Sequence, residues 1–224
     1  MQFILSTGWE EGMADLTERL IQELSKGKHV LWLVTGGSNI EASVTIMNNI
    51  SDGLSTNLTV MLADERYGKV GHTDSNWAQL MAAGFDGKQA RLLPVLRDGD
   101  SFEEAANYYN QIAQKAFDEN EVVVSQMGIG PDGHIAGILP ESVAGKEPEA
   151  LVAGYSGGPY QRLTMTFPAL RRIAVDYSFA FGEGKRQALE SLRVKTTTLL
   201  QQPAQILWEL PEAYVYNDQI GDQK

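Results

Sequence analysis

Cysteine, positive charge and long apolar runs are absent or scarce in this 224-residue sequence, and each absence excludes a class of protein. Without cysteine there is no disulfide framework, no thiolate nucleophile and no cysteine-ligated zinc site, so any nucleophile must be oxygen or nitrogen. No uncharged apolar stretch is long enough to cross a bilayer, and no basic segment precedes an apolar one near the first residues. We therefore expect a soluble, unexported protein of the cytoplasm that does not bind membranes.

The shortage of positive charge restricts the ligands. The chain has 18 Lys and Arg against 29 Asp and Glu, a formal net charge of −11. Nucleic-acid binding depends on a basic surface, so the charge argues against a nucleic-acid partner. It also repels small anions at long range. A phosphate ester therefore requires a few cations, or a helix N-terminus, gathered in one place.

What the sequence does contain is an alternation of apolar runs with stretches of helical period. Four runs predict strands buried on both faces, at residues 29–35, 58–63, 91–95 and 121–127. Residues 10–25 and 101–117 each place apolar side chains on one helical stripe. This pattern predicts an α/β fold with a doubly wound, mostly parallel, Rossmann-like sheet, in a single domain covering residues 1–224.

After about residue 150 the pattern becomes strand-rich, with apolar segments at 150–156, 162–167 and 172–181. These segments predict a small strand-rich C-terminal extension or lid, completed by a helix over residues 184–193. The polar ending NDQIGDQK, residues 217–224, is expected to fray.

Three predicted strands end in unusual loops: TGGS (35–38), DERYGKVGHTDSN (64–76) and GIGPDGH (128–134). Ligands of open parallel sheets bind beyond the carboxyl ends of the strands. Because a parallel sheet brings these ends to one edge, we expect the glycine loop, the charged loop and the histidine loop to converge there.

The TGGS loop has a structural and a functional interpretation. Ser38 is expected to be the N-cap of a helix, with Glu41 completing a capping box. Gly36 and Gly37 also allow backbone N–H groups to approach an anion at the positive end of that helix. The loop is not a Walker motif, because no Gly-Lys-Ser/Thr follows.

In the charged loop, Asp64, Glu65, His72 and Asp74 lack the fixed helical spacing of a metal motif, so we expect no metal. Arg66 is of more interest. A guanidinium held by its neighbouring carboxylates can present a rigid fork to a phosphate group.

Two further motifs match known functional patterns only in part, and we expect neither to have the matching function. GIGPDG matches the G-x-G-x-x-G dinucleotide pattern, but Pro131 and Asp132 stand where the turn should lead into a helix. GYSGG (154–158) matches a nucleophile elbow around Ser156, yet strand-like sequence follows it, and no later histidine completes a triad.

Among the three histidines, His29 begins a buried strand and His72 lies in a loop, so both have structural explanations. His134 follows a strand-end turn at Gly133. Its neighbour Asp132 carries a carboxylate that can orient the imidazole and raise its basicity. His134 is therefore the candidate general base.

Taken in order, TGGS, DERYGKVGHTDSNW, GIGPDGHIAGILP, RLTMTFPAL and FGEGKRQALE resemble the 6-phosphogluconolactonase branch of the glucosamine-6-phosphate deaminase (NagB-type) and sugar-phosphate isomerase superfamily. The resemblance extends over nearly the whole chain, to LWELPEA. It implies a Rossmann-like fold and hydrolysis of 6-phosphoglucono-δ-lactone in the pentose phosphate pathway, without metal or cofactor, by a monomer or homodimer.

The resemblance also implies roles for individual residues. His134 would draw a proton from the attacking water, and Asp132 would orient the imidazole. The implied substrate-binding residues are Gly36, Gly37, Ser38, Asp64, Arg66, Arg162 and Lys185.

Some positions depart from the family pattern. The usual GGSTP is GGSNI here, DGHTASLFP is DGHIAGILP, and a lysine common in an SPKPP segment is absent from YSGGPYQR. In the deaminase branch a glutamate assists ring opening at the position of Leu139, which favours the lactonase. An amino-sugar deaminase or aldose-ketose isomerase, and a non-catalytic sugar-phosphate-binding protein, remain the alternatives.

Overall fold

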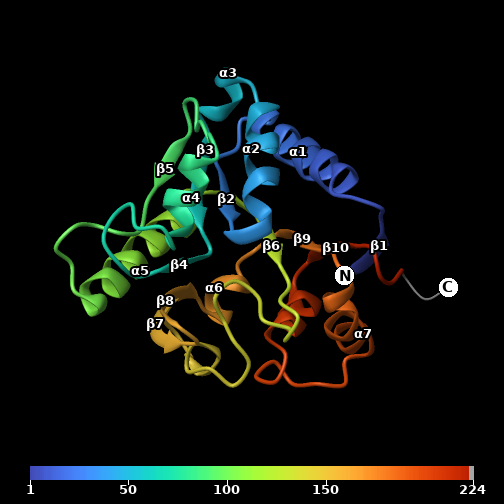
Figure 1. Ribbon diagram of the computed structural model, residues 1–224. Coiled ribbons are helices and arrows are strands. Elements are labelled where there is room, and N and C mark those ends of the chain that lie inside the picture. Colours follow the sequence, from blue (N-terminus) through green and yellow to red (C-terminus); the bar gives the residue numbers. More distant parts are fainter. Residues whose placement is uncertain (222–224) are drawn as a thin grey trace.

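A seven-stranded sheet organises the chain, of which the computed structural model describes residues 1–221 (Figure 1). The strand order is β1-β10-β9-β6-β2-β3-β5, and every neighbouring pair is parallel. The strands of this sheet are β1 (Gln2–Leu5), β2 (Val30–Val34), β3 (Leu58–Leu62), β5 (Arg91–Leu93), β6 (Val122–Gly128), β9 (Val175–Ala180) and β10 (Glu212–Asn217). The predicted doubly wound, mostly parallel α/β fold is thus confirmed.

Helices cover both faces of the sheet (Figure 1). The α-helices are α1 (Glu10–Ser25), α2 (Ile40–Asn48), α3 (Asp52–Ser55), α4 (Asn76–Ala82), α5 (Phe102–Glu119), α6 (Phe167–Leu170) and α7 (Arg186–Val194). The described residues also form the 3₁₀ helices η1 (Gly37–Asn39), η2 (Ala144–Lys146), η3 (Glu183–Lys185) and η4 (Pro203–Glu209). None of the helices in residues 1–221 is both long and apolar enough to cross a membrane.

The central strands explain why two layers of helices are needed. In β2, Trp32 packs in the core that α1 and α2 cover, whereas Leu31 and Leu33 pack in the core on the opposite face, with α5 and α7. All three side chains have an exposed fraction of 0%. A strand that is buried on both faces has a continuous run of apolar residues, and this run is the pattern from which β2 was predicted.

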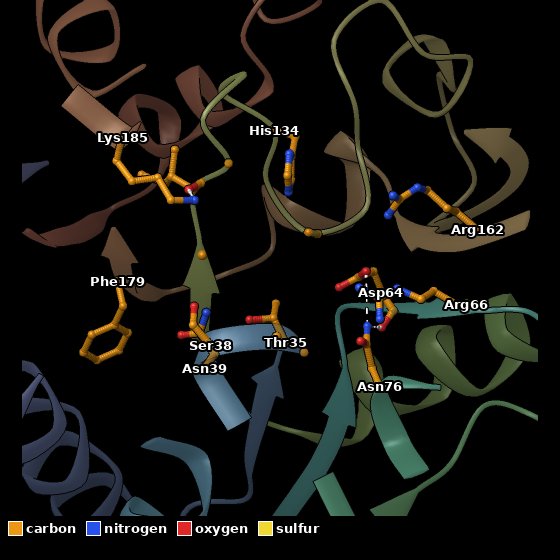
Figure 2. Close-up of a pocket in the computed structure, with 16 residues that line it drawn as sticks. Thr35, Ser38, Asn39, Asp64, Arg66, Asn76, His134, Arg162, Phe179 and Lys185 are labelled. Atoms are coloured by element: carbon orange, nitrogen blue, oxygen red, sulfur yellow. Dashed lines mark hydrogen bonds between the residues drawn. The ribbon is translucent and has the colours of Figure 1, made fainter. Parts of the chain in front are cut away.

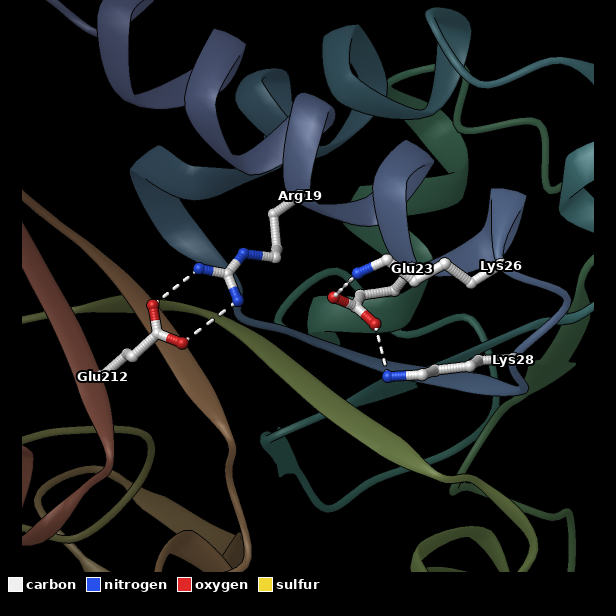
Figure 3. Close-up of polar contacts among 5 residues, drawn as sticks. All are labelled: Arg19, Glu23, Lys26, Lys28 and Glu212. Carbon is white, nitrogen blue, oxygen red and sulfur yellow. Dashed lines mark hydrogen bonds and ion pairs between the residues drawn. The ribbon is translucent and has the colours of Figure 1, made fainter.

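Helix α1 is held mainly by its buried leucine stripe, and ion pairs fix its polar side (Figure 3). Arg19 pairs with Glu212 at the start of β10, with 2.6 Å between Nη2 and Oε2. Glu23 accepts from Lys26 at 2.9 Å and Lys28 at 2.7 Å, and these bonds, that of Lys28 first, lower its pKa. Such partly exposed pairs are typically worth about 0–1 kcal/mol each, so apolar burial dominates the packing of α1.

A second, antiparallel sheet stands beside the carboxyl ends of the main strands, with the order β4-β8-β7. It comprises β4 (Asp64–Arg66), β7 (Val152–Gly157) and β8 (Tyr160–Met165). The expectation of a C-terminal extension is only partly right, because β4 comes from the loop after β3, and the segment 172–181 contributes β9 to the main sheet. The motif DER is therefore a strand and not a loop.

The expectation that residues 217–224 fray is also wrong within the described part of the chain. Asn217 is the last residue of β10, and its Oδ1 accepts from the backbone N–H groups of Gln219 and Ile220. Ile220 packs in the core with 6% exposure. Residues 222–224 lie outside the described residues.

Candidate active site

A pocket of about 230 Å³ lies beyond the carboxyl ends of β2, β3 and β6 (Figure 2). Its walls come from all three loops that the sequence singled out, together with Arg162 of β8, Phe179 of β9 and Lys185 of η3. Every predicted site residue except Asp132 lines this pocket. The expected convergence of the glycine, charged and histidine loops is therefore observed, because the parallel strands deliver them to one edge.

His134 closes a tight turn that begins where β6 ends. Gly130 N–H donates to the carbonyl of His134 at 2.9 Å, and Gly133 sits at φ +79°. A Cβ at Gly130 would lie 2.0 Å from Nδ1 of His134, so only glycine admits the ring there. The turn thus fixes the position of the imidazole, which points toward the pocket in Figure 2.

Asp132 holds this ring from behind. Its Oδ1 lies 2.6 Å from His134 Nδ1 and also accepts from the backbone N–H of His134 at 3.2 Å. The side-chain hydrogen bond to His134 is the main cause that lowers the pKa of Asp132 to about 2. Because an ionised carboxylate only accepts, Nδ1 is the nitrogen that donates in this pair, so in the neutral ring Nε2 carries the lone pair.

Lys185 lies on one side of the pocket (Figure 2). Its Nζ donates to the carbonyl of Ile129 at 2.6 Å, which leaves two of its three N–H groups for a ligand. Burial lowers the pKa of Lys185, and the nearby charge of Asp132 opposes that effect.

Two arginines, Arg66 and Arg162, lie across the pocket from Lys185 (Figure 2). They are register partners in the antiparallel pair of β4 and β8, and their guanidinium carbons lie 4.9 and 5.5 Å from the ring centroid of Tyr160. Nε of Arg162 donates to the carbonyl of Gly157 at 3.0 Å. Like charges directly opposite each other destabilise a strand pair, and an anion between them would relieve this repulsion.

The carboxylates beside Arg66 do not hold it in the way the sequence suggested. Nη1 of Arg66 donates to the backbone carbonyl of Asp74 at 3.1 Å, and its buried Nε has no hydrogen-bond partner among residues 1–221. The carboxylate of Glu65 instead accepts from the N–H groups of Asn76 and Trp77, so it holds the start of α4. Burial raises the pKa of Glu65.

Asp64 forms part of the pocket floor with 7% exposure. Burial raises its pKa, while the charges of Arg66, Arg162 and His134 act in the opposite direction. Asn76 Nδ2 donates to the backbone carbonyl of Asp64 at 3.0 Å and to its Oδ2 at 3.3 Å. Asn76 also packs closely against the glycine loop, since a Cβ at Gly36 would lie 1.9 Å from its Oδ1, so only glycine fits there.

The expected capping box at Ser38 and Glu41 is wrong. The chain first makes one 3₁₀ turn, η1, in which Gly37 has φ +65°. Helix α2 then starts with Asn39 as its N-cap, without a side-chain cap hydrogen bond. Ser38 consequently lines the pocket from the turn before the helix.

Several pocket residues were not foreseen: Thr35, Asn39, Asn76, Gly128, Ile129, Gly130, Ala136 and Phe179. Of these, Asn39 and Asn76 carry amide side chains with partners on other elements: Asn39 lies against Gln126 of β6, and Asn76 donates to Asp64 of β4. Their position in the motifs GGSN and DSN was the only signal available.

The structure does not support the metal, dinucleotide or nucleophile-elbow interpretation of the other motifs, although Gly128, Ile129 and Gly130 of GIGPDG line the pocket. No group of three or more His, Cys, Asp or Glu in residues 1–221 is arranged to hold a metal ion, and His72 Nε2 lies 2.9 Å from the carbonyl of Arg66. No helix follows the glycines of GIGPDG, and Ser156 lies exposed on β7.

Comparison with known proteins identifies relatives over almost the whole chain. The family described as glucosamine-6-phosphate isomerases/6-phosphogluconolactonase matches residues 9–215. A 6-phosphogluconolactonase of Pseudomonas aeruginosa is 26% identical over 211 residues, which cover 87% of each protein. One from Bos taurus is 32% identical over 114 residues, and that match spans 48% of this chain and 43% of the relative.

Solved structures of similar fold also cover almost the whole chain. The crystal structure of a 6-phosphogluconolactonase from Shewanella baltica superposes with a TM-score of 0.80 at 19% identity, covering 97% of both chains. At that identity the likeness establishes the fold, and the chemistry has to be argued from the pocket.

Proposed function

Because this chain belongs to the family of glucosamine-6-phosphate isomerases and 6-phosphogluconolactonases, we propose that it hydrolyses 6-phosphoglucono-δ-lactone to 6-phosphogluconate, a step of the pentose phosphate pathway. The observation that carries the proposal is the pair His134–Asp132, which presents a free Nε2 to a pocket with three cationic side chains. We expect this enzyme to act in the cytoplasm as a single-domain monomer or homodimer.

The proposed reaction needs only a base and anion-binding groups. Nε2 of His134 takes a proton from water as the water oxygen bonds to the lactone carbonyl carbon. The tetrahedral oxyanion then collapses, the bond from that carbon to the ring oxygen breaks, and the imidazolium returns the proton to the departing oxygen. Asp132 remains ionised and holds the ring. A positioned base of this kind contributes about 10²–10⁴ in rate.

The phosphate end of the substrate is matched by the cations. Arg66, Arg162 and Lys185 gather positive charge in a chain whose net charge is −11. The start of α2, preceded by Gly37 and Ser38, adds backbone N–H groups at a positive helix end. These groups overcome the long-range repulsion locally, because short-range hydrogen bonds to charged groups are strong.

The deaminase alternative has less support in this pocket. Leu139 stands where that branch has its ring-opening glutamate, and its backbone N–H donates to the hydroxyl of Tyr155 at 3.2 Å. Leu139 is not among the residues that line the pocket. No carboxylate therefore occupies that position to act with His134.

Turnover of freshly prepared 6-phosphogluconolactone, followed as acid release above the spontaneous rate, tests the proposal. We expect saturable hydrolysis, and loss of at least a hundredfold in kcat with His134→Ala at an unchanged melting temperature. Equal kcat for His134→Ala and the parent would contradict the role of His134. Ammonia release from glucosamine 6-phosphate would support the deaminase, and binding of 6-phosphogluconate without turnover would support a non-catalytic binding protein.

A further inference from the structure

Asn39 is a buried polar residue of the pocket that no part of the proposed mechanism uses. Its exposed fraction is 3%, and its side chain lines the pocket beside Ser38, on the side where Lys185 lies (Figure 2). Within residues 1–221 its Nδ2 donates no hydrogen bond to the protein. Because Nδ2 has no acceptor in this part of the protein, water or a ligand in the pocket has to accept its hydrogen bonds.

The orientation of this amide follows from its neighbour Gln126 on β6. Nε2 of Gln126 donates to the backbone carbonyl of Asn39 at 3.0 Å, and a carbonyl can only accept. The same Nε2 lies 3.4 Å from the side-chain oxygen of Asn39. The Oδ1 of Asn39 must therefore face Gln126, and its Nδ2 must face the other way.

Ser43, one turn further along α2, fixes Gln126 in turn. Its hydroxyl lies 2.9 Å from Oε1 of Gln126 and 3.1 Å from the carbonyl of Asn39. Both Ser43 and Gln126 are 0% exposed, so water does not compete for these bonds. Since Ser43 occupies Oε1, Gln126 is held with Nε2 toward Asn39.

Nδ2 of Asn39 points past the end of β6. A Cβ at Gly128 would lie 2.8 Å from that nitrogen, so glycine at this position keeps the space above the amide open. The next residue, Ile129, is the one whose carbonyl holds Lys185 Nζ at 2.6 Å. Asn39 Nδ2 therefore lies beside Gly128, and Lys185 Nζ is bound to the next residue, Ile129. Both donors line the pocket near the positive start of α2.

We infer that Asn39 is a substrate-binding residue that donates from Nδ2 to the phosphate group of the ligand, and that Gln126 and Ser43 are positioning residues that hold the amide in this orientation. The inference rests on the proposed function for the class of ligand. It assigns a role to an asparagine at a position where the family pattern GGSTP has threonine, and where this chain has GGSNI.

The test compares Asn39→Asp and Asn39→Ala with Asn48→Asp, which adds the same charge at the exposed far end of α2. For 6-phosphogluconolactone we expect KM to rise about tenfold with Asn39→Ala and about a hundredfold with Asn39→Asp, while kcat changes by less than about threefold. Asn48→Asp should leave both constants within about twofold of the parent. Melting temperatures confirm that each variant is folded.

Glucono-δ-lactone, which lacks the phosphate, identifies the group that Asn39 contacts. We expect kcat/KM for this substrate to be the same in the parent and in both Asn39 variants, within about twofold. An equal loss on both lactones would overturn the assignment to the phosphate, as would an unchanged KM for the phosphorylated lactone.

Gln126→Met tests the positioning step, because it releases the amide without touching the pocket wall. We expect a KM increase for the phosphorylated lactone that approaches that of Asn39→Ala, with kcat preserved. An unchanged KM in a folded Gln126→Met variant would contradict the role of Gln126.

Calorimetric titration of each variant with 6-phosphogluconate separates this inference from the proposed function. If the parent binds that ligand but hydrolyses no lactone, the proposed activity fails, while the dissociation constants of the Asn39 variants still test the phosphate contact. A parent that hydrolyses the lactone, with Asn39 variants that bind 6-phosphogluconate as tightly as the parent does, would overturn the inference alone.

Discussion

Asp176, on β9, makes the stability of this protein depend on pH. Its carboxyl group is fully buried and accepts hydrogen bonds from the hydroxyls of Ser125 at 2.5 Å and Ser178 at 2.6 Å. Burial raises the pKa of Asp176 from 3.8 to about 7, and the two serine hydrogen bonds oppose that rise only in part. The group lies outside the pocket, so its titration can be measured without disturbing ligand binding.

The sign of the effect follows from the two protonation states. Between pH 3.8 and about 7 the folded protein keeps the Asp176 proton while the unfolded chain releases it. The folded state then binds more protons, so stability falls as the pH rises through this window. The free energy of unfolding decreases by about 1.4 kcal/mol for each pH unit in this window. The decrease is about 4 kcal/mol over the whole window and about 3 kcal/mol between pH 5 and about 7.

Urea unfolding of the parent and of Asp176→Asn between pH 5 and pH 8 measures this quantity. The amide cannot ionise, so we expect the stability of the variant relative to the parent to increase by about 3 kcal/mol from pH 5 to pH 7 and to level off above that. Other titrating groups cancel in the difference. Asp52→Asn, an exposed carboxylate at the start of α3, is the matched control. A constant offset between the Asp176→Asn and parent curves would refute the reasoning, because it would mean that Asp176 is ionised in the folded state throughout.

Four further substitutions test other parts of the structure. Asp132→Asn should lower kcat for the lactone by about 10²–10⁴ without unfolding the protein, because an amide no longer requires a proton on Nδ1 of His134; an unchanged kcat would show that the ring needs no such partner. Lys185→Met should chiefly raise KM for the phosphorylated lactone, and Arg162→Met should do the same; if affinity for 6-phosphogluconate is unaffected, the phosphate lies elsewhere. Ser101→Ala should lower the melting temperature by about 2–4 °C with kcat unchanged, because Ser101 is the N-cap of a complete capping box at the start of α5; a melting temperature equal to the parent's would show that the cap contributes nothing.

The central strands could be predicted from the sequence because burial on both faces leaves a continuous apolar run. β2, β3 and β6 appear within a residue or two of the expected positions. β4 could not be predicted in this way, because all three of its residues, Asp64, Glu65 and Arg66, are charged. It forms a strand only by pairing with β8, about a hundred residues further along the chain. Polar strands of that kind have no local signal.

Local signals also misplaced one helix start. Ser38 and Glu41 fit a capping box, but the close approach of Gly36 to Asn76 and the positive φ of Gly37 take the chain through an extra turn first. The capping box at Ser101 lies at the start of a helix that was predicted from its apolar stripe alone. Tertiary contacts decided which serine caps a helix.

For the pocket, the motif at each strand end could be found from the sequence, whereas the contacts between motifs could not. The roles assigned to His134, Asp132 and the cations stay predictions, although the structure places these side chains together. Asn76 and Gln126 could not be predicted as site residues, because the role of an amide side chain depends on its hydrogen-bond partners, which only the structure shows. Gln126 lies within an apolar run and carries no motif.

The parallel pairing of β1 with β10 constrains how the molecule is assembled. Of the strands described in residues 1–221, β1 is synthesised before the others, yet its one sheet neighbour among them is β10, which is synthesised after the others. During synthesis β2, β3 and β6 can already pair with one another, while Gln2–Leu5 must wait, unpaired, until Glu212–Asn217 has docked beside β9. β1 is thus among the last of these strands to take its place, so a chain stalled before β10 keeps Gln2–Leu5 without its strand partner.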